Sequence, residues 1–310
     1  MIGQKLLVPF LWLMFAAFPF FACKSALKNK PITPRVGFDW QGHRGCRGLM
    51  PENSLPAFLH ALDFPEVVTL ELDLAVSKDN QLIISHEPWF NPAICLLPSG
   101  DSIPQRDAEK NLIYQFTASE IQAFDCGSLG NARFPQQQKQ RTYKPTLAEV
   151  VAAVRAKAVG RTLRWNIEIK SQPEWDGLRH PPVEEFVRLT IAGLKSLGLE
   201  NTATVQSFDV RALQALHRQA PNIPLVLLVE NIWGLDSNLE KLGFTPQVYS
   251  PYYQLVSKKM VQKCHAKNIQ VIPWTVNDVA SMRGMIQLGV DGIITDYPNL
   301  IREVGKDDGQ

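Results

Sequence analysis

Segments that read as strands alternate with segments that read as helices along almost the whole chain of 310 residues. From Thr146 onward the helix TLAEVVAAV is followed by the strand LRWNIEIK, and the same alternation continues toward the C-terminus. With strands predicted at Val36–Trp40 and Val67–Val76, eight strands precede or follow helices. This pattern predicts an α/β protein with a (β/α)8 TIM barrel. An open doubly wound sheet is the alternative, although the chain has no glycine-rich dinucleotide fingerprint.

One long region interrupts this alternation. After the second strand, QLIIS follows the turn 78–80 and is predicted to be a hairpin partner of that strand. The region 89–143 that comes next has no clear periodicity, and loops of such length are uncommon inside a compact domain. We therefore expect a barrel over residues 36–306, with residues 89–143 as a small inserted subdomain over its active face.

The N-terminus has the pattern of an export signal. Leu6 to Phe21 form an apolar run preceded by Lys5, which is too short for a typical membrane span. Cys23 follows this run, as in a bacterial lipoprotein processing site, and the alternative is a signal that is cleaved or retained. We expect residues 1–23 to be a signal, residues 24–35 a basic tether, and the protein to be exported, either periplasmic or lipid-anchored to a bacterial membrane. Membrane contact is expected only through this N-terminal part.

Net charge and cysteine content argue against two classes of protein, those that bind nucleic acids and those built on a disulfide scaffold. The formal net charge is +2 and no long basic block is present, so we expect no nucleic-acid partner. The chain after Cys23 has only four cysteines, too few for a disulfide scaffold. Cys95 and Cys126 lie in the same irregular region and are candidates for a disulfide. The alternative is that both stay thiols, as we expect for Cys46 and Cys264.

Acidic residues on two predicted strands suggest a cation site. Glu71 and Asp73 are two apart, so they point to the same face with α-carbons roughly 7 Å apart. Glu168 lies on the next barrel strand and adds a third inward carboxylate. Three acids inside a barrel repel one another unless a hard divalent cation takes their oxygens as ligands. The alternative is an acid pair at a strand rim that meets arginines.

Two histidines and two cationic residues follow strand-like runs close to these acids. An unperturbed imidazole titrates near neutrality, so one of His43 and His86 is expected to take a proton from an attacking hydroxyl while the other donates to a leaving alkoxide. Arg44 offers a planar fork that matches a phosphate, and Lys170 adds a point charge two residues beyond Glu168. The remaining four histidines lie in predicted helices or loops without neighbouring acids of this kind, and we expect no catalytic role for them.

Four short motifs in this order resemble the glycerophosphodiester phosphodiesterase family: HRG, PEN, ELD and SHEP. The C-terminal run from Trp274 to Val304 is also similar to that family, so the likeness spans nearly the whole chain after the N-terminal segment. The resemblance implies a barrel phosphodiesterase with a small insertion, acting on a small-molecule glycerophosphodiester. It implies release of glycerol 3-phosphate and an alcohol.

The same resemblance implies roles for individual residues. Glu71, Asp73 and Glu168 would be the metal ligands, and all-oxygen ligation fits one Mg²⁺ or Ca²⁺ better than zinc. His43 and His86 would do the acid/base work. Trp274 is expected to form an aromatic wall beside the glycerol, and Gln206 and Phe208 are weaker candidates for substrate contacts. Glu52 is expected to orient Arg44 or to join the metal.

Two departures from the family pattern bear on function. Glu87 stands where the family usually has Asp after the second histidine, and the insertion lacks most of the family's landmarks. Because neighbours on an extended segment point to opposite sides, we expect Glu87 to face away when His86 faces in. A sphingomyelinase D-like phospholipase that forms a cyclic phosphate is an alternative function. So is a lipid-anchored binding protein without activity, which should lack an acid or a histidine; none is missing.

Overall fold

Residues 34–306 are described in a computed structural model of the chain. The predicted signal at 1–23 and all of the tether except Pro34 and Arg35 lie outside the described residues. Within residues 34–306, no helix combines the length and the apolar character needed to cross a bilayer.

Eight parallel strands form a nearly closed barrel, in the order β8-β7-β6-β5-β4-β2-β1-β9. The two end strands are linked by backbone hydrogen bonds, from Asp291 N to Val271 O at 2.8 Å and from Ile294 N to Pro273 O at 3.0 Å. The (β/α)8 prediction is confirmed and the open sheet is excluded. The strands are β1 (Asp39–Gly42), β2 (Thr69–Val76), β3 (Leu82–Ile84), β4 (Arg164–Ile169), β5 (Ala203–Ser207), β6 (Leu225–Val229), β7 (Val248–Pro251), β8 (Gln270–Val271) and β9 (Gly292–Thr295).

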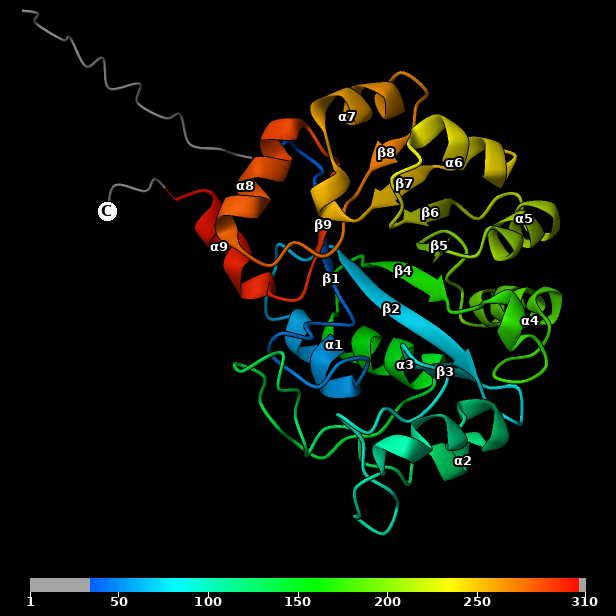
Figure 1. The fold of residues 1–310 in the computed structure, drawn as a ribbon. Coiled ribbons are helices and arrows are strands. Elements are labelled where there is room, and N and C mark those ends of the chain that lie inside the picture. The colour runs from blue at the N-terminus through cyan, green and yellow to red at the C-terminus, as the bar shows by residue number, and fades with distance from the viewer. Residues whose placement is uncertain (1–33, 307–310) are drawn as a thin grey trace, which may run out of the picture. The chain divides into compact units, whose positions relative to one another are not determined.

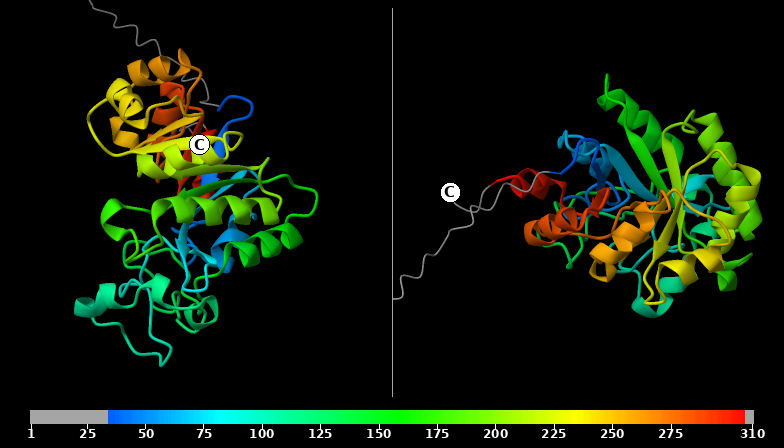
Figure 2. Two further views of the ribbon diagram at one scale, coloured as in Figure 1. Left: turned by 90° about the vertical axis from the view of Figure 1, so that its right-hand side faces the viewer. Right: turned by 90° about the horizontal axis from the view of Figure 1, so that it is seen from above.

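Helices cover the outside of the strands (Figures 1 and 2). Most begin at a polar N-cap, as in the capping box of α3, where Thr146 and Glu149 each accept a hydrogen bond from the other's backbone N–H. Their apolar faces and the outward faces of the strands make one large core. The helices are α1 (Leu55–Ala61), α2 (Ala118–Ile121), α3 (Leu147–Lys157), α4 (Val183–Ser196), α5 (Val210–Gln219), α6 (Leu235–Leu242), α7 (Lys258–His265), α8 (Val279–Leu288) and α9 (Ile301–Val304).

Strand boundaries differ from the sequence prediction in several places, and two of these differences have a clear cause. β1 begins at Asp39 rather than Val36, because Gly37 has a φ of +80° and turns the chain before pairing with β9 begins. β8 covers only Gln270 and Val271 of the predicted strand QVIPW, since Pro273 has no N–H to donate. The hairpin partner is confirmed, because β3 pairs antiparallel with β2.

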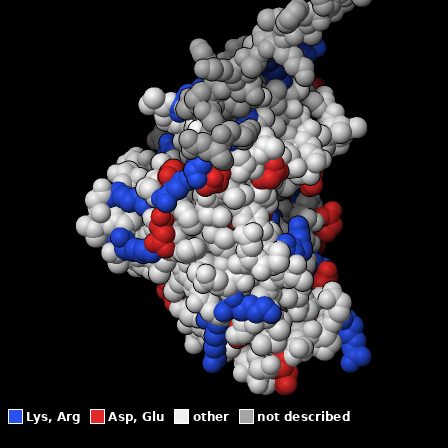
Figure 3. All heavy atoms as spheres, turned by 90° about the vertical axis from the view of Figure 1, so that its left-hand side faces the viewer, with Lys and Arg blue, Asp and Glu red and all other residues white. Residues whose placement is uncertain are grey.

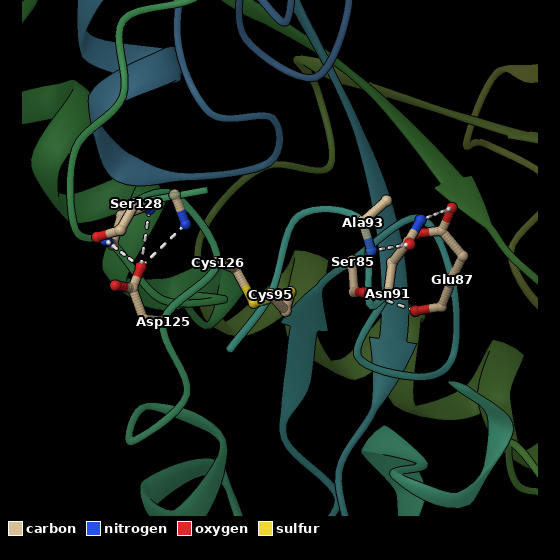
Figure 4. Close-up of a disulfide and its surroundings, with 10 residues drawn as sticks. Ser85, Glu87, Asn91, Ala93, Cys95, Asp125, Cys126 and Ser128 are labelled. Atoms are coloured by element: carbon tan, nitrogen blue, oxygen red, sulfur yellow. Dashed lines mark hydrogen bonds between the residues drawn. A yellow bond between two sulfur atoms is a disulfide. The ribbon is translucent and has the colours of Figure 1, made fainter. Parts of the chain in front are cut away.

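Segment 89–143 lies beyond the ends of β2 and β3 and carries α2 and two 3₁₀ helices (Figure 1). It has a small apolar cluster of its own, in which Phe90 stacks on Phe124 with ring centroids 3.6 Å apart. Cys95 and Cys126 of this cluster are joined by a disulfide (Figure 4). Cys46 and Cys264 are free and buried. Ala75 of β2 and Ile83 of β3 belong to the same cluster, so the segment packs on the barrel and the disulfide adds a covalent link within it.

Removal of this disulfide should lower stability. The bridge closes a loop of 31 residues, and a loop of that length is worth about 3 to 4 kcal/mol in the chain-entropy estimate. A Cys95→Ser/Cys126→Ser variant should therefore unfold at a lower denaturant concentration than the wild type. Reductant should destabilise the wild type similarly and leave the double variant unchanged. Equal midpoints for all samples would show that the bridge does not stabilise the fold.

The distribution of charged side chains on the surface agrees with the small net charge of the chain. On the face drawn in Figure 3, basic and acidic side chains are interspersed among uncharged ones, with no broad basic area among the coloured residues.

Candidate active site

A cavity of about 1160 Å³ opens at the carboxyl ends of the barrel strands. Each of the eight barrel strands, or the segment that follows it, contributes to its lining, as does the insertion through Trp89 and Phe134. This is the end of a barrel where loops assemble an active site. The cavity brings together most of the residues predicted from sequence: His43, Arg44, Glu71, His86, Glu168, Lys170, Gln206, Phe208 and Trp274.

The turn after β1 is built so that its backbone passes close to the acids. Arg44 has a φ of +49° and Gly45 a φ of +82°, and a Cβ on Gly45 would lie 2.6 Å from the backbone of Ala57. A left-handed arginine is unfavourable, and it persists where the surroundings fix it. Here the Arg44 N–H donates to Glu71 Oε2 at 2.9 Å, which ties this turn to β2.

Glu71, Asp73 and Glu168 form a buried acidic triad. Each offers a carboxylate oxygen, and these oxygens lie within 4.8 Å of one another. Burial raises the pKa of Glu168 to about 7 against the opposing charge of Lys170, and burial followed by the charge of Asp73 raises the pKa of Glu71 well above its usual value. Buried oxygen Oδ1 of Asp73 has no hydrogen-bond partner among the described residues.

The donors around the triad leave room for a cation. Asn53 donates to Asp73 Oδ2 at 2.8 Å, and Gln206 donates to Glu71 Oε1 at 2.7 Å. These amides hold the carboxylates without neutralising them. Three convergent oxygens, one of them unsatisfied, fit a hard divalent ion. Gln206, a weaker substrate-contact candidate from the sequence, is therefore held against the triad rather than free in the cavity.

His43 is held by an aspartate that the sequence analysis did not single out. Nδ1 of His43 lies 2.6 Å from Asp296 Oδ1, and Arg47 donates to both oxygens of the same carboxylate at 2.9 and 3.0 Å. Burial, followed by the charge of Arg47, lowers the pKa of His43 to about 4. At neutral pH the ring is therefore neutral, with Nδ1–H donating to Asp296 and Nε2 able to accept a proton.

His86 is held by its own neighbour, so the prediction that Glu87 faces away is wrong. Glu87 Oε1 lies 3.1 Å from His86 Nδ1. Asn91 donates to the same oxygen at 3.4 Å (Figure 4). The alternation rule fails because β3 ends at Ile84 and the chain turns before this pair. Burial would raise the pKa of Glu87, but the hydrogen bond from His86 and the charges of His86 and Lys144 hold it well below the usual range.

The predicted phosphate ligands are only partly free. Arg44 Nη1 donates to Glu52 Oε1 at 2.6 Å, and its Nε lies 3.2 Å from Asp73 Oδ2. Glu52 therefore orients Arg44 and is not part of the triad. Lys170 Nζ lies 2.9 Å from Glu168 and 5.9 Å from the centroid of Phe208. Both cations face the cavity beside the acids, where an anionic group would be held.

Aromatic residues form the other wall of the cavity. Trp274 donates its indole N–H to Ser250 O at 2.9 Å and packs on the apolar cluster that fills the barrel interior. Phe208 lies edge-on to it, with ring centroids 5.4 Å apart, and is 41% exposed. These two candidates are thus neighbours at the mouth of the cavity.

Three residues of this site were missed in the sequence analysis: Arg47, Asn53 and Asp296. The position of each of them in the sequence gave a signal that could have identified it. Asp296 comes directly after the apolar run GIIT, as His43 and His86 come after theirs, and the other two lie in the same glycine-rich turn as Arg44. A search for polar residues immediately after every predicted barrel strand would have found Asp296.

Comparison with known proteins gives this site a context. A profile of the Glycerophosphoryl diester phosphodiesterase family matches residues 43–300. The Glycerophosphodiester phosphodiesterase of Bacillus altitudinis is 30% identical over 261 residues, which cover 83% of this chain and 94% of that protein. The protein of the same name from Bacillus subtilis (strain 168) is 26% identical over 270 residues, covering 85% of both chains.

Solved structures show the same fold. A protein of Silicibacter pomeroyi DSS-3 that is assigned to this family superposes with a TM-score of 0.77 at 27% identity, covering 88% of this chain and 95% of that one. A phosphodiesterase of Oleispira antarctica, solved in complex with the product sn-glycerol-3-phosphate, has a TM-score of 0.68 at 22% identity. It covers 86% of this chain and 96% of that one, and at this identity the likeness concerns the fold alone.

Proposed function

Because this chain belongs to the glycerophosphoryl diester phosphodiesterase family and is a phosphodiesterase of that kind, we propose that it hydrolyses glycerophosphodiesters to glycerol 3-phosphate and an alcohol. In the proposed reaction, one divalent cation and two histidines act on the phosphodiester. The observation that supports it most is the convergence of the buried acidic triad with His43 and His86 in one cavity. A phosphodiester needs charge neutralisation and proton transfer on both sides of phosphorus, and these residues offer both.

The two histidines are proposed to move the protons. His43, neutral and fixed through Asp296, presents Nε2 to the cavity, while His86 is fixed through Glu87. One ring accepts a proton from the water that attacks phosphorus. The other ring, in its protonated form, donates a proton to the alcohol oxygen as its bond to phosphorus breaks, so no free alkoxide leaves. Each transfer is worth about 100- to 10,000-fold in rate.

The charged residues are proposed to hold the phosphate. Glu71, Asp73 and Glu168 would bind Mg²⁺ or Ca²⁺, which would supply positive charge to a phosphate oxygen. Lys170 and the free edge of Arg44 would add two further charges. All-oxygen ligands favour these two ions over zinc. Trp274 is proposed to lie beside the glycerol.

Release of glycerol 3-phosphate from glycerophosphocholine tests the proposal directly. We expect release with Mg²⁺ or Ca²⁺, loss on chelation, and recovery when the ion is returned. A substrate panel run first in Mg²⁺ and then in Ca²⁺ identifies the ion. Absence of turnover with every divalent ion would refute the proposal. A cyclic phosphate product would instead support the sphingomyelinase D-like alternative.

Substitution of Glu87 tests how His86 is held. Glu87→Ala removes the partner of Nδ1 and should lower kcat about 10- to 100-fold, the usual cost of losing a group that orients a functional histidine. Glu87→Asp retains a carboxylate and should change kcat less than tenfold. A steady-state comparison at constant cation concentration measures both. Equal losses in the two variants would mean that side-chain length, not charge, fixes the ring.

Export is proposed as the location of this activity. The N-terminal apolar run has the length of a signal, and the disulfide between Cys95 and Cys126 requires an oxidising compartment. Fractionation of cells that produce the full-length chain would test this. Mass spectrometry of the mature N-terminus would distinguish lipidated Cys23 from simple cleavage, and recovery of the intact chain in the cytosol would contradict the proposal.

A further inference from the structure

We propose that the cavity contains a separate subsite for a positively charged alcohol group, at the ends of β6, β7 and β8. The subsite consists of Glu230, Tyr252 and Trp274, and we call it the ammonium subsite. It rests on the proposed phosphodiesterase function and specifies its substrate class. That class is the diesters whose alcohol carries a quaternary or primary ammonium group, of which choline and ethanolamine are the simplest.

Strand register places the three residues at one level. Val229 at the end of β6 is paired with Pro251 of β7, so Glu230 and Tyr252 follow side by side. Tyr252 is bridged in turn to Trp274, which follows β8. All three side chains line the cavity. Three adjacent strand ends therefore present one carboxylate and two aromatic rings to the same part of the cavity.

Glu230 is the one carboxylate of the cavity lining without a protein partner among residues 34–306. It has no hydrogen bond or ion pair within the described part of the chain. The other lining carboxylates all belong to the triad or hold a histidine; they are Glu71, Glu168, Glu87 and Asp296. Glu230 is exposed to solvent at this wall of the cavity, so a cation is able to reach its carboxylate, and the unpaired negative charge attracts cations to this part of the cavity.

The aromatic rings beside it are fixed and carry no protein cation. Tyr252 lies with its centroid 5.7 Å from Trp274 and 5.2 Å from Tyr253. Within residues 34–306, no lysine or arginine stacks on Tyr252 or Trp274, whereas Arg179 already covers Trp89 and Trp175 elsewhere in the cavity. Aromatic faces bind quaternary ammonium groups well, and rings held in place lose little freedom on binding.

The subsite also lies where the alcohol of the substrate has to extend. In the ring of strands, β6 is opposite β1, which carries His43 and Arg44. A phosphate held near β1, β2 and β4 therefore has the ammonium subsite across the cavity from it. Trp274 stands between Phe208 and Tyr252, which leaves the Phe208 side to the glycerol and the Tyr252 side to the alcohol.

Kinetics with two substrates test the role of Glu230. Glycerophosphocholine has a cationic alcohol group, and glycerophosphoglycerol is the matching diester whose alcohol group is uncharged. Glu230→Gln should raise KM for glycerophosphocholine about fivefold, the upper range for one partly exposed ion pair, and should leave glycerophosphoglycerol unchanged within twofold. Glu200→Gln, an exposed acid next to the opposite end of β5, is the matched control and should change neither. Equal effects on both substrates, or no effect on either, would overturn the subsite.

Variants of Tyr252 test the aromatic contribution, and direct binding keeps the test independent of turnover. Tyr252→Phe retains the ring and should bind tetramethylammonium like the wild type in calorimetry, whereas Tyr252→Leu should bind it at least threefold more weakly. Equal binding by all three proteins would refute the ammonium subsite even if the enzyme is active. Failure of the wild type to cleave either diester, with tetramethylammonium still bound, would refute the proposed function and leave the subsite standing.

Discussion

His43→Ala and His86→Ala should each lower turnover of a glycerophosphodiester by about 1,000-fold, with folding intact. Each ring is fixed by a carboxylate and opens onto the cavity that holds the acidic triad. An alanine at either position removes a proton transfer that no neighbouring group replaces in the same place. Initial rates under saturating cation would measure the loss, and circular dichroism would report folding.

The two variants should differ with an activated leaving group. A p-nitrophenyl ester needs no proton on the departing oxygen, so it should restore most of the turnover of the variant that lacks the general acid. The same ester should not restore the turnover of the variant that lacks the general base. The comparison therefore shows which histidine is the acid and which is the base. His60→Ala is the control, because His60 lies on α1, contacts Asp63 and Phe64, and does not line the cavity. Near-native turnover of His86→Ala on natural substrates would remove His86 from the mechanism.

Much of the fold could be predicted because its periodicity is local. Buried parallel strands such as Leu225–Val229 are continuous apolar runs, and helices between them begin at residues that cap them, such as Ser257 and Asp278. The acids of the site were predictable for the same reason. Their spacing of two residues on β2 determines that both point to the same face of the strand, and the barrel makes that face the interior.

Contacts between distant segments could not be predicted in this way. Asp296 reaches His43 across 253 residues of sequence, and only closure of the barrel between β1 and β9 brings them together. Glu87 was misplaced because alternation applies to extended chain, and the chain turns immediately after β3. Pairing of Cys95 with Cys126 likewise depends on how an irregular segment folds back on itself.

Glu168→Gln should abolish cation binding and turnover without weakening the metal-free fold. Three carboxylates whose oxygens lie within 4.8 Å repel one another in a buried site, so loss of one charge should leave the metal-free melting temperature equal or higher. The wild type should gain about 2.7 kcal/mol at a hundredfold excess of Mg²⁺ or Ca²⁺ over its Kd, and the variant should gain almost nothing. Thermal melts with and without the ion measure both effects, with Glu200→Gln as a control that should respond like the wild type. A variant that loses stability without the ion yet still responds to it would show that Glu168 supports the fold through Lys170 and is not a ligand.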